Sequence, residues 1–421
     1  MSSSDGYPAT KPTLLLDFAN TKVLDPRVTF TRASTGTYFD EFGLIKSAIS
    51  GTPRFTHAPL TGKSLGLLVE EQRTNLLTYS EEFDNAAWTK SFTTITANAI
   101  VSPEGTMDAD KMVDDTNTGS HTVSNATSVT ITSETTLTAS VFAKSAEGTY
   151  VIVGIGDGSG TNISRSTFNL STGAITSSTT ATANVSAPIP VITSVGNGWY
   201  RCSVTATVTG VTTAQEWIYK GSNASGAATY TGDGTSGIYI WGAQLGAGAF
   251  PTSYIPTTTA QVTRAADVAV MTGTNFSSWF NALEGTFYAE IIPMTADYSS
   301  NKNIFLASDN TASNSLGLRY TSSGTQASMG STVSAVLQAN VVTGTLVAGT
   351  TYRVAGSYKV NDFKGVRDGG SVGTDTTGTV PTVTRAEIGC LAGINIGSQT
   401  LSKLAYYPLS VTSTQLQGLT L

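Results

Sequence analysis

The stretch GIYIWGAQL, residues 237–245, shows what kind of fold this chain forms. In an extended strand successive side chains point to opposite faces, so Ile238 and Ile240 share one face while Tyr239 and Trp241 share the other. Both faces are therefore apolar, which is the pattern of a strand covered on both sides. We accordingly expect Trp241 to be a core residue rather than an exposed platform for a sugar ring.

The composition extends this prediction to the whole chain. Charged residues make up only 12% of the 421 residues, so long solvated helices are not expected. Threonine, valine, isoleucine and tyrosine favour a pleated backbone, and the short gaps between them hold the glycine, asparagine, aspartate and serine that form turns. The sequence therefore predicts an all-β protein with few short helices.

Turn signals and proline positions divide the chain into parts. Pro251 and Pro256 interrupt any strand ladder and stiffen a crossover. A turn at Asp40 to Gly43 predicts a hairpin, and Thr412 followed by Gln415 has the spacing of a capping box that begins a short terminal helix. The predicted parts are an N-terminal hairpin and extended docking segment (1–74), a first β-sandwich (75–250), a linker (251–262) and a second β-sandwich (263–421).

Charge and cysteine usage exclude several classes of protein. The net charge of −6 and the scattered basic residues give no surface for a phosphate backbone, so nucleic acid is not an expected partner. No apolar run approaches the roughly 18 residues that cross a bilayer, and no secretory signal pattern is present, so we expect no membrane insertion and synthesis in a cytoplasm. Cys202 and Cys390 lie far apart, which predicts buried free thiols rather than a disulfide or zinc site.

No catalytic or cofactor motif can be assigned. Neighbouring acids such as Glu70 and Glu71 point to opposite faces of a strand and cannot form the facing pair of a glycosidase. His57 and His121 have no metal or triad spacing. The glycine-rich run at 154–160 lacks the helix that a dinucleotide site needs. We therefore predict no catalytic residue, no metal ligand and no cofactor, with a structural calcium held by acidic turns as an open alternative.

Three segments resemble parts of tailed-bacteriophage virion proteins of the head-spike fibre and tail fibre type. They are TPRFTHAPLTGKSLGLLVEEQRTNLLTYSEEFDNAAWTK (52–90), GIYIWGAQLGAGAFPTSYIPTTTAQVTRAADVA (237–269) and LSKLAYYPLSVTSTQLQGLT (401–420). The resemblance implies a carbohydrate-binding jelly roll for the first sandwich and a concanavalin A-like domain, of lectin and glucanase type, for the second.

The resemblance also implies a function. We expect a structural and adhesive protein on the surface of a phage virion, made in the bacterial host cytoplasm, that is not an enzyme. Its partners would be further copies in a homotrimer, other capsid or tail proteins bound through the N-terminal segment, and glycans of the host surface. Two alternatives stay open: a tail spike enzyme that degrades polysaccharide, and a capsid decoration that only stabilises the particle.

Sugar binding needs an exposed aromatic face with polar partners. In WYRCSVTATV, residues 199–208, Trp199 and Arg201 fall on the more polar face and form the first candidate pair. Trp217 and Tyr219, which also share a face, form the second. For each pair the alternative is that a further layer of the protein covers that face.

Overall fold

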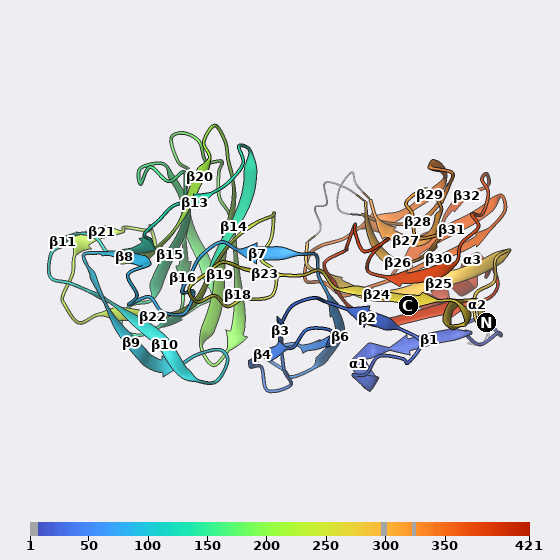
Figure 1. Ribbon diagram of the computed structural model, residues 1–421, viewed down its shortest axis with the longest axis horizontal. Helices are drawn as coiled ribbons and strands as arrows, with labels where there is room; N and C mark the ends of the chain where they lie inside the picture. The colour runs from blue at the N-terminus through green and yellow to red at the C-terminus, as the bar shows by residue number, and fades with distance from the viewer. Residues whose placement is uncertain (1–6, 296–300, 322–325) are drawn as a thin grey trace.

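Strands dominate the computed structural model, which describes residues 7–295, 301–321 and 326–421. These residues form many antiparallel strands and three short helices, so the all-β prediction is confirmed. The chain forms two bodies that lie side by side, and its first and last described elements, β1 (Leu14–Asp17) and α3 (Ser413–Thr420), both lie on the C-terminal one (Figure 1). Within the described residues no helix is long and apolar enough to cross a bilayer.

The middle sandwich consists of two packed sheets. The strand order of the first sheet is β18 (Ile189–Gly196), β19 (Trp199–Val208), β14 (Thr135–Ser145), β22 (Gly237–Ala247), β10 (Met107–Asp114) and β9 (Thr93–Val101). The order of the second is β17 (Ala174–Thr179), β16 (Ile163–Asn169), β15 (Tyr150–Gly156), β20 (Thr213–Gly221), β12 (Thr122–Asn125) and β8 (Trp88–Ser91), with β13 (Val129–Thr130) beside β20. A short pair, β11 (Thr118–Ser120) and β21 (Thr229–Thr231), lies at one end.

The C-terminal sandwich also has two sheets. One has the order β32 (Gly373–Asp375), β31 (Asp362–Arg367), β30 (Tyr352–Lys359), β25 (Glu284–Pro293), β34 (Gln399–Tyr407), β6 (Ser64–Val69) and β5 (Arg54–His57), with β1 (Leu14–Asp17) also on β34. The other has the order β2 (Thr29–Thr31), β24 (Val268–Thr272), β33 (Arg385–Ile388), β26 (Lys302–Ser308), β27 (Ser315–Tyr320), β28 (Gln326–Val333) and β29 (Val336–Thr345). The helices α1 (Phe18–Thr21), α2 (Thr274–Ser277) and α3 (Ser413–Thr420) all belong to this body.

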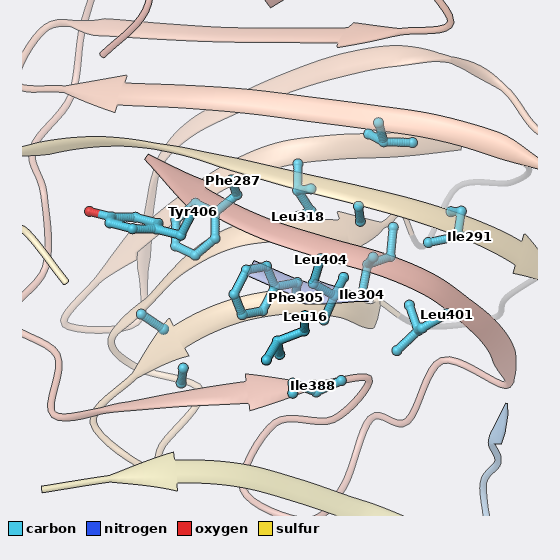
Figure 2. Close-up of a cluster of buried hydrophobic side chains, with 14 of the residues drawn as sticks. Leu16, Phe287, Ile291, Ile304, Phe305, Leu318, Ile388, Leu401, Leu404 and Tyr406 are labelled. Atoms are coloured by element: carbon cyan, nitrogen blue, oxygen red, sulfur yellow. The ribbon is translucent and has the colours of Figure 1, made fainter. Parts of the chain in front are cut away.

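The prediction that residues 1–74 form a separate docking segment is wrong for its described part, from residue 7 onward; residues 1–6 lie outside the described residues. Strands β1, β2, β5 and β6 complete the two sheets of the C-terminal sandwich. Leu16 of β1 packs among Phe305, Leu404 and Ile388 in its core (Figure 2). Strand pairing across several hundred residues leaves no local pattern in the sequence, which is why the alternation of residues 1–74 did not reveal it.

The middle sandwich is therefore an insertion in the C-terminal one. The chain enters it through β7 (Arg73–Asn75) and leaves it through β23 (Val262–Arg264), and these two strands pair with each other. The predicted linker thus ends at β23, and the two-stranded sheet of β7 and β23 joins the two ends of the insertion. The boundary near residue 74 is therefore the point where the insertion interrupts the C-terminal sandwich, whose two parts are the residues before 74 and those after 262.

The predicted hairpin is present and fills the space between the two bodies. It consists of β3 (Gly36–Phe39) and β4 (Ile45–Ala48). Ile45 packs against Trp241, Phe142 and Tyr254 on the outer face of the first sheet of the middle sandwich. Trp241 is fully buried, as predicted, because its ring lies on the outer face of the sheet and the other side chains of this cluster cover it there.

The first prediction tests whether the N-terminal strand belongs to the core. Leu16 is 3% exposed and its neighbour Leu15 is 53% exposed. Leu16→Ala is expected to lower the free energy of unfolding of the C-terminal sandwich by about 2–5 kcal/mol, since it leaves a cavity in a packed core. Leu15→Ala is the matched control and should change it by less than about 0.5 kcal/mol. Equal effects of the two substitutions in urea titrations would contradict the interleaved fold.

Candidate functional site

The two aromatic pairs predicted to bind sugars lie on different sheets of the middle sandwich. Trp199 and Arg201 lie on β19, on the face of the first sheet that the hairpin covers. Trp217 and Tyr219 lie on β20 in the second sheet. The fold therefore separates the two pairs and gives them different surroundings.

Trp199 is a buried residue. It is 2% exposed and packs in the cluster that contains Ile45 and Trp241. Its indole Nε1–H donates to the carbonyl oxygen of Val101 at 3.2 Å. Because neither face of its ring reaches solvent, Trp199 cannot stack on a sugar. The alternative stated for this pair, a further layer of protein over the polar face, is the correct one for Trp199, and the hairpin forms part of that layer.

Arg201 is partly exposed, but its charged group is held by the protein. Its guanidinium donates to Ser140 Oγ at 3.0 Å and to the backbone carbonyl of Thr252, and lies 5.3 Å from the centre of the Phe142 ring. Burial lowers the pKa of Arg201 to about 10, which still leaves the side chain charged at neutral pH. The groups that bind Arg201 thus come from the sheet and from residues 251–262, which we call the crossover segment.

Trp217 and Tyr219 form the aromatic group that remains accessible. Their rings stack with centres 5.9 Å apart, and the Arg165 guanidinium lies 5.1 Å from the centre of the Tyr219 ring. Trp217 and Arg165 are partly exposed, whereas Tyr219 is 3% exposed beneath them. The prediction had named both aromatic residues but not Arg165, which lies on a different strand.

Glycines on the neighbouring strand make room for the indole. Gly154 of β15 pairs with Trp217 of β20 on one side and with Arg165 of β16 on the other. Because glycine has no side chain, the space between Trp217 and Arg165 is not filled by a residue of β15. A Cβ atom at Gly156 would lie 2.9 Å from Trp217 Nε1. The glycine-rich run at residues 154–160 therefore lets the indole lie low over the sheet, and it serves packing rather than nucleotide binding.

This face has the groups that a sugar needs. A pyranose stacks its apolar face on an aromatic ring and offers hydroxyls to charged and amide groups. Trp217 provides the partly exposed ring and Arg165 provides donors, whereas Trp217 Nε1 lies buried against Gly156. The surface formed by Trp217, Tyr219 and Arg165 is our candidate glycan face.

A polar cavity of about 220 Å³ lies at one end of the same sandwich. Lys220 Nζ is 2.6 Å from an Asp114 carboxylate oxygen, and the Tyr230 hydroxyl donates to the other Asp114 oxygen at 2.8 Å. Tyr150 contributes a further hydroxyl to the cavity lining. Sequence reasoning missed this group because its members come from four separate elements, and no local spacing links them.

One carboxyl has a pKa suited to proton transfer near neutral pH. Burial raises the pKa of Glu81 to about 7, against the opposing effect of the Tyr254 hydroxyl, which donates to it at 2.9 Å. Burial likewise raises the pKa of nearby Asp110 to about 6. Within the described residues no group of three or more His, Cys, Asp or Glu side chains is arranged to hold a metal ion.

Comparisons with known proteins give no family. No family model matches the chain, and no curated protein matches it. Among solved structures, Trypanosoma rangeli sialidase aligns with 74% of this chain at 12% identity and a TM-score of 0.29, and this chain spans 60% of the sialidase. Domains LG4–5 of the mouse laminin α1 chain align with 71% of this chain at 12% identity, covering 88% of that structure with a TM-score of 0.25. At TM-scores this low the likeness supports no argument about activity.

The expectation that the protein is not an enzyme needs correction. Several of the similar solved structures are sialidases, including one described as a covalent intermediate with difluorosialic acid. Because the similar structures are enzymes, we withdraw the expectation that this protein is not one, although likeness at this level does not show activity.

The second prediction separates the buried from the accessible tryptophan. Trp199→Ala is expected to lower the free energy of unfolding by about 3–5 kcal/mol, because it removes a large side chain from a closed cluster. Trp217→Ala should lower it by a clearly smaller amount, since its ring is partly solvated. Thermal and urea unfolding of both variants give the measurement, and a fully stable Trp199→Ala protein would refute the covered-face assignment.

The third prediction concerns pH. Because the folded pKa of Glu81 is raised from 4.5 to about 7, its contribution to stability is fully present below about pH 4.5 and is lost as the pH rises through about 7. Glu81→Gln keeps an acceptor for Tyr254 and cannot ionise, so at pH 8 the variant should be more stable than wild type by at most about 3 kcal/mol. At pH 5 the difference should shrink.

Melting temperatures at pH 5 and pH 8 measure the effect. Glu82→Gln, at an exposed neighbour, is the control and should show no such pH dependence. A constant difference between Glu81→Gln and wild type at both pH values would contradict the raised pKa.

Proposed function

We propose that the protein is a surface component of a bacteriophage particle, a fibre or spike of its head or tail, that attaches to host-surface glycans through the candidate glycan face. The observation that carries the glycan part is the partly exposed Trp217 stacked on Tyr219, with Arg165 over the Tyr219 ring. The particle part rests on the three segments that resemble virion proteins, residues 52–90, 237–269 and 401–420.

The fold is consistent with a protein exposed outside cells. The middle sandwich is inserted in the C-terminal one, and a slow unfolding rate would protect a particle that no chaperone repairs. The first and last described elements, β1 and α3, both lie on the C-terminal sandwich (Figure 1). We therefore assign contact with other virion proteins to that body, in place of a free N-terminal segment, and leave the middle sandwich to face the host.

Oligomerisation would supply the affinity that one shallow face lacks. A single stacked sugar gives weak binding, whereas three linked copies raise the avidity without any new contact. A homotrimer is therefore part of the proposal. Analytical ultracentrifugation of the purified chain measures it directly.

The fourth prediction tests the glycan face. Trp217→Ala should weaken binding to host-surface polysaccharide by about tenfold or more, because truncating a central aromatic contact removes about 2 kcal/mol. Phe42→Ala, at the tip of the hairpin and 77% exposed, is the control and should leave binding unchanged. A glycan array and adsorption to host cells are the two measurements.

The same binding measurements, with an assay for released reducing ends, distinguish glycan attachment from a capsid decoration and from a glycan-cleaving enzyme. Unchanged binding by Trp217→Ala would show that the glycan face is wrong, and binding to no glycan at all would favour a decoration that only stabilises the capsid. Release of reducing ends would identify the protein as a glycan-cleaving enzyme. In that case Glu81 is the first carboxyl to replace, since its raised pKa allows it to donate a proton at neutral pH.

A further inference from the structure

A crevice of about 210 Å³ lies where the hairpin, the crossover segment and the two sandwiches meet. Its walls are mostly apolar and include Phe39, Ile45, Leu65, Leu68 and Phe142. They come from β3, β4, β6 and β14, so the crevice exists only when the N-terminal strands and the middle sandwich are together. It is separate from the candidate glycan face, which lies on the other sheet of the middle sandwich.

Arg201 forms part of this wall and has no carboxylate within ion-pair distance among the described residues. Glu70, which has the largest favourable electrostatic effect on Arg201, is already bound to Arg54 at 2.7 Å and lies 3.6 Å from Arg264. Glu216 also acts on Arg201 but forms no ion pair with it among the described residues, and burial raises the pKa of Glu216 well above its ordinary value. The charge of Arg201 is thus left without a counter-ion.

The excess of positive charge extends beyond one residue. Behind the wall, three guanidiniums share two carboxylates, those of Glu70 and Asp267. With Arg201, which is partly exposed, the group has four cations and two anions, a net charge of +2, and the other five side chains are closed to solvent. A charge removed from water is unfavourable unless an opposite charge compensates it, so an anion in the crevice would be stabilised.

Hydrogen-bonding capacity is also free in the crevice. Each terminal nitrogen of Arg201 carries two hydrogens and has one recorded acceptor, the Thr252 carbonyl for one and Ser140 Oγ for the other. His57 also lines the crevice, is 94% buried from solvent, and its Nε2 has no partner among the described residues. Its Nδ1 lies 3.1 Å from the Phe39 carbonyl, so Nδ1 donates, and Nε2 of the neutral ring is an acceptor that a carboxylate does not need; the free donors are therefore those of Arg201.

We propose that this crevice binds a small organic carboxylate with an apolar body, its carboxylate on Arg201 and its carbon skeleton among Phe39, Leu65 and Phe142. The guanidinium provides charge-assisted hydrogen bonds to the carboxylate. The apolar walls exclude strongly hydrated anions, and the volume restricts the ligand to a size below that of a drug-like molecule. Because three parts of the fold line it, such a ligand stabilises their assembly.

The test uses the full chain with matched probes. Benzoate and hexanoate are titrated at constant ionic strength, with benzyl alcohol and hexanol as neutral counterparts of the same shape, and binding is followed by calorimetry and by melting temperature. We expect saturable binding of the carboxylates, with a rise in melting temperature, and at least about tenfold weaker binding of the alcohols, since a hydrogen bond to a charged group contributes about 1.5–3 kcal/mol.

Two variants and one control test whether benzoate binds in the crevice and on Arg201. Arg201→Gln should weaken benzoate binding by about tenfold or more. Arg319→Gln is the control, because Arg319 is likewise partly exposed without an acidic partner among the described residues, but lies on β27 of the C-terminal sandwich away from the crevice. If Arg201→Gln does not fold, Leu65→Trp decides, since it fills the crevice from a partly exposed position and should abolish binding with Arg201 intact.

Three results would overturn the proposal. These are equal binding of the alcohols and the carboxylates, unchanged binding by Leu65→Trp, or binding of glucuronate as tight as that of benzoate, which would mean that the apolar walls do not select the ligand. None of these measurements depends on Trp217. Failure of the glycan proposal and failure of this one are therefore distinguishable.

Discussion

A buried network of five charged side chains holds the molecule together. Arg32, Arg54 and Glu70 come from the first 70 residues, and Arg264 and Asp267 come from the segment after the insertion, and all five side chains are at most 1% exposed. Burial alone would raise the pKa of Glu70, but Arg264 and Arg54 lower it to about 2. Removing one member of such a network leaves an uncompensated buried charge, which costs about 3–5 kcal/mol. Both halves of the C-terminal sandwich must therefore be in place before either is stable.

The rest of the architecture follows from this network. It fixes the two ends of the insertion beside each other, where β7 and β23 pair, and Ser253 of the crossover donates to Glu70 through both its backbone and its hydroxyl. The crossover is thereby held against the middle sandwich, and the hairpin of β3 and β4 is held over its first sheet. The burial of Trp199 and Trp241, and the walls of the crevice around Arg201, are consequences of that placement.

Local features of the structure could be predicted from the sequence because their causes are local. The turn at Asp40 to Gly43 forms a hairpin, Thr412 and Gln415 form a capping box, and the alternation around Trp241 marks a strand covered on both sides. The placement of residues 14–69 could not be predicted, because edge strands pair with partners more than 200 residues away. For the same reason, the alternation of residues 199–208 identified the more polar face of β19 correctly. It could not show that a hairpin from another part of the chain covers that face.

The choice between the two candidate aromatic pairs is thus made by packing rather than by residue type. Trp199 with Arg201 and Trp217 with Tyr219 offer the same chemistry in the sequence, but Trp199 is enclosed whereas Trp217 keeps a partly solvated ring. Arg201 has no carboxylate within ion-pair distance among the described residues. A partly exposed aromatic ring suits a large, hydroxyl-rich ligand that binds many copies at once, whereas a cation in an apolar crevice suits a small anion. The two proposed sites would therefore select ligands of different size and charge, because they lie on different sheets of the middle sandwich.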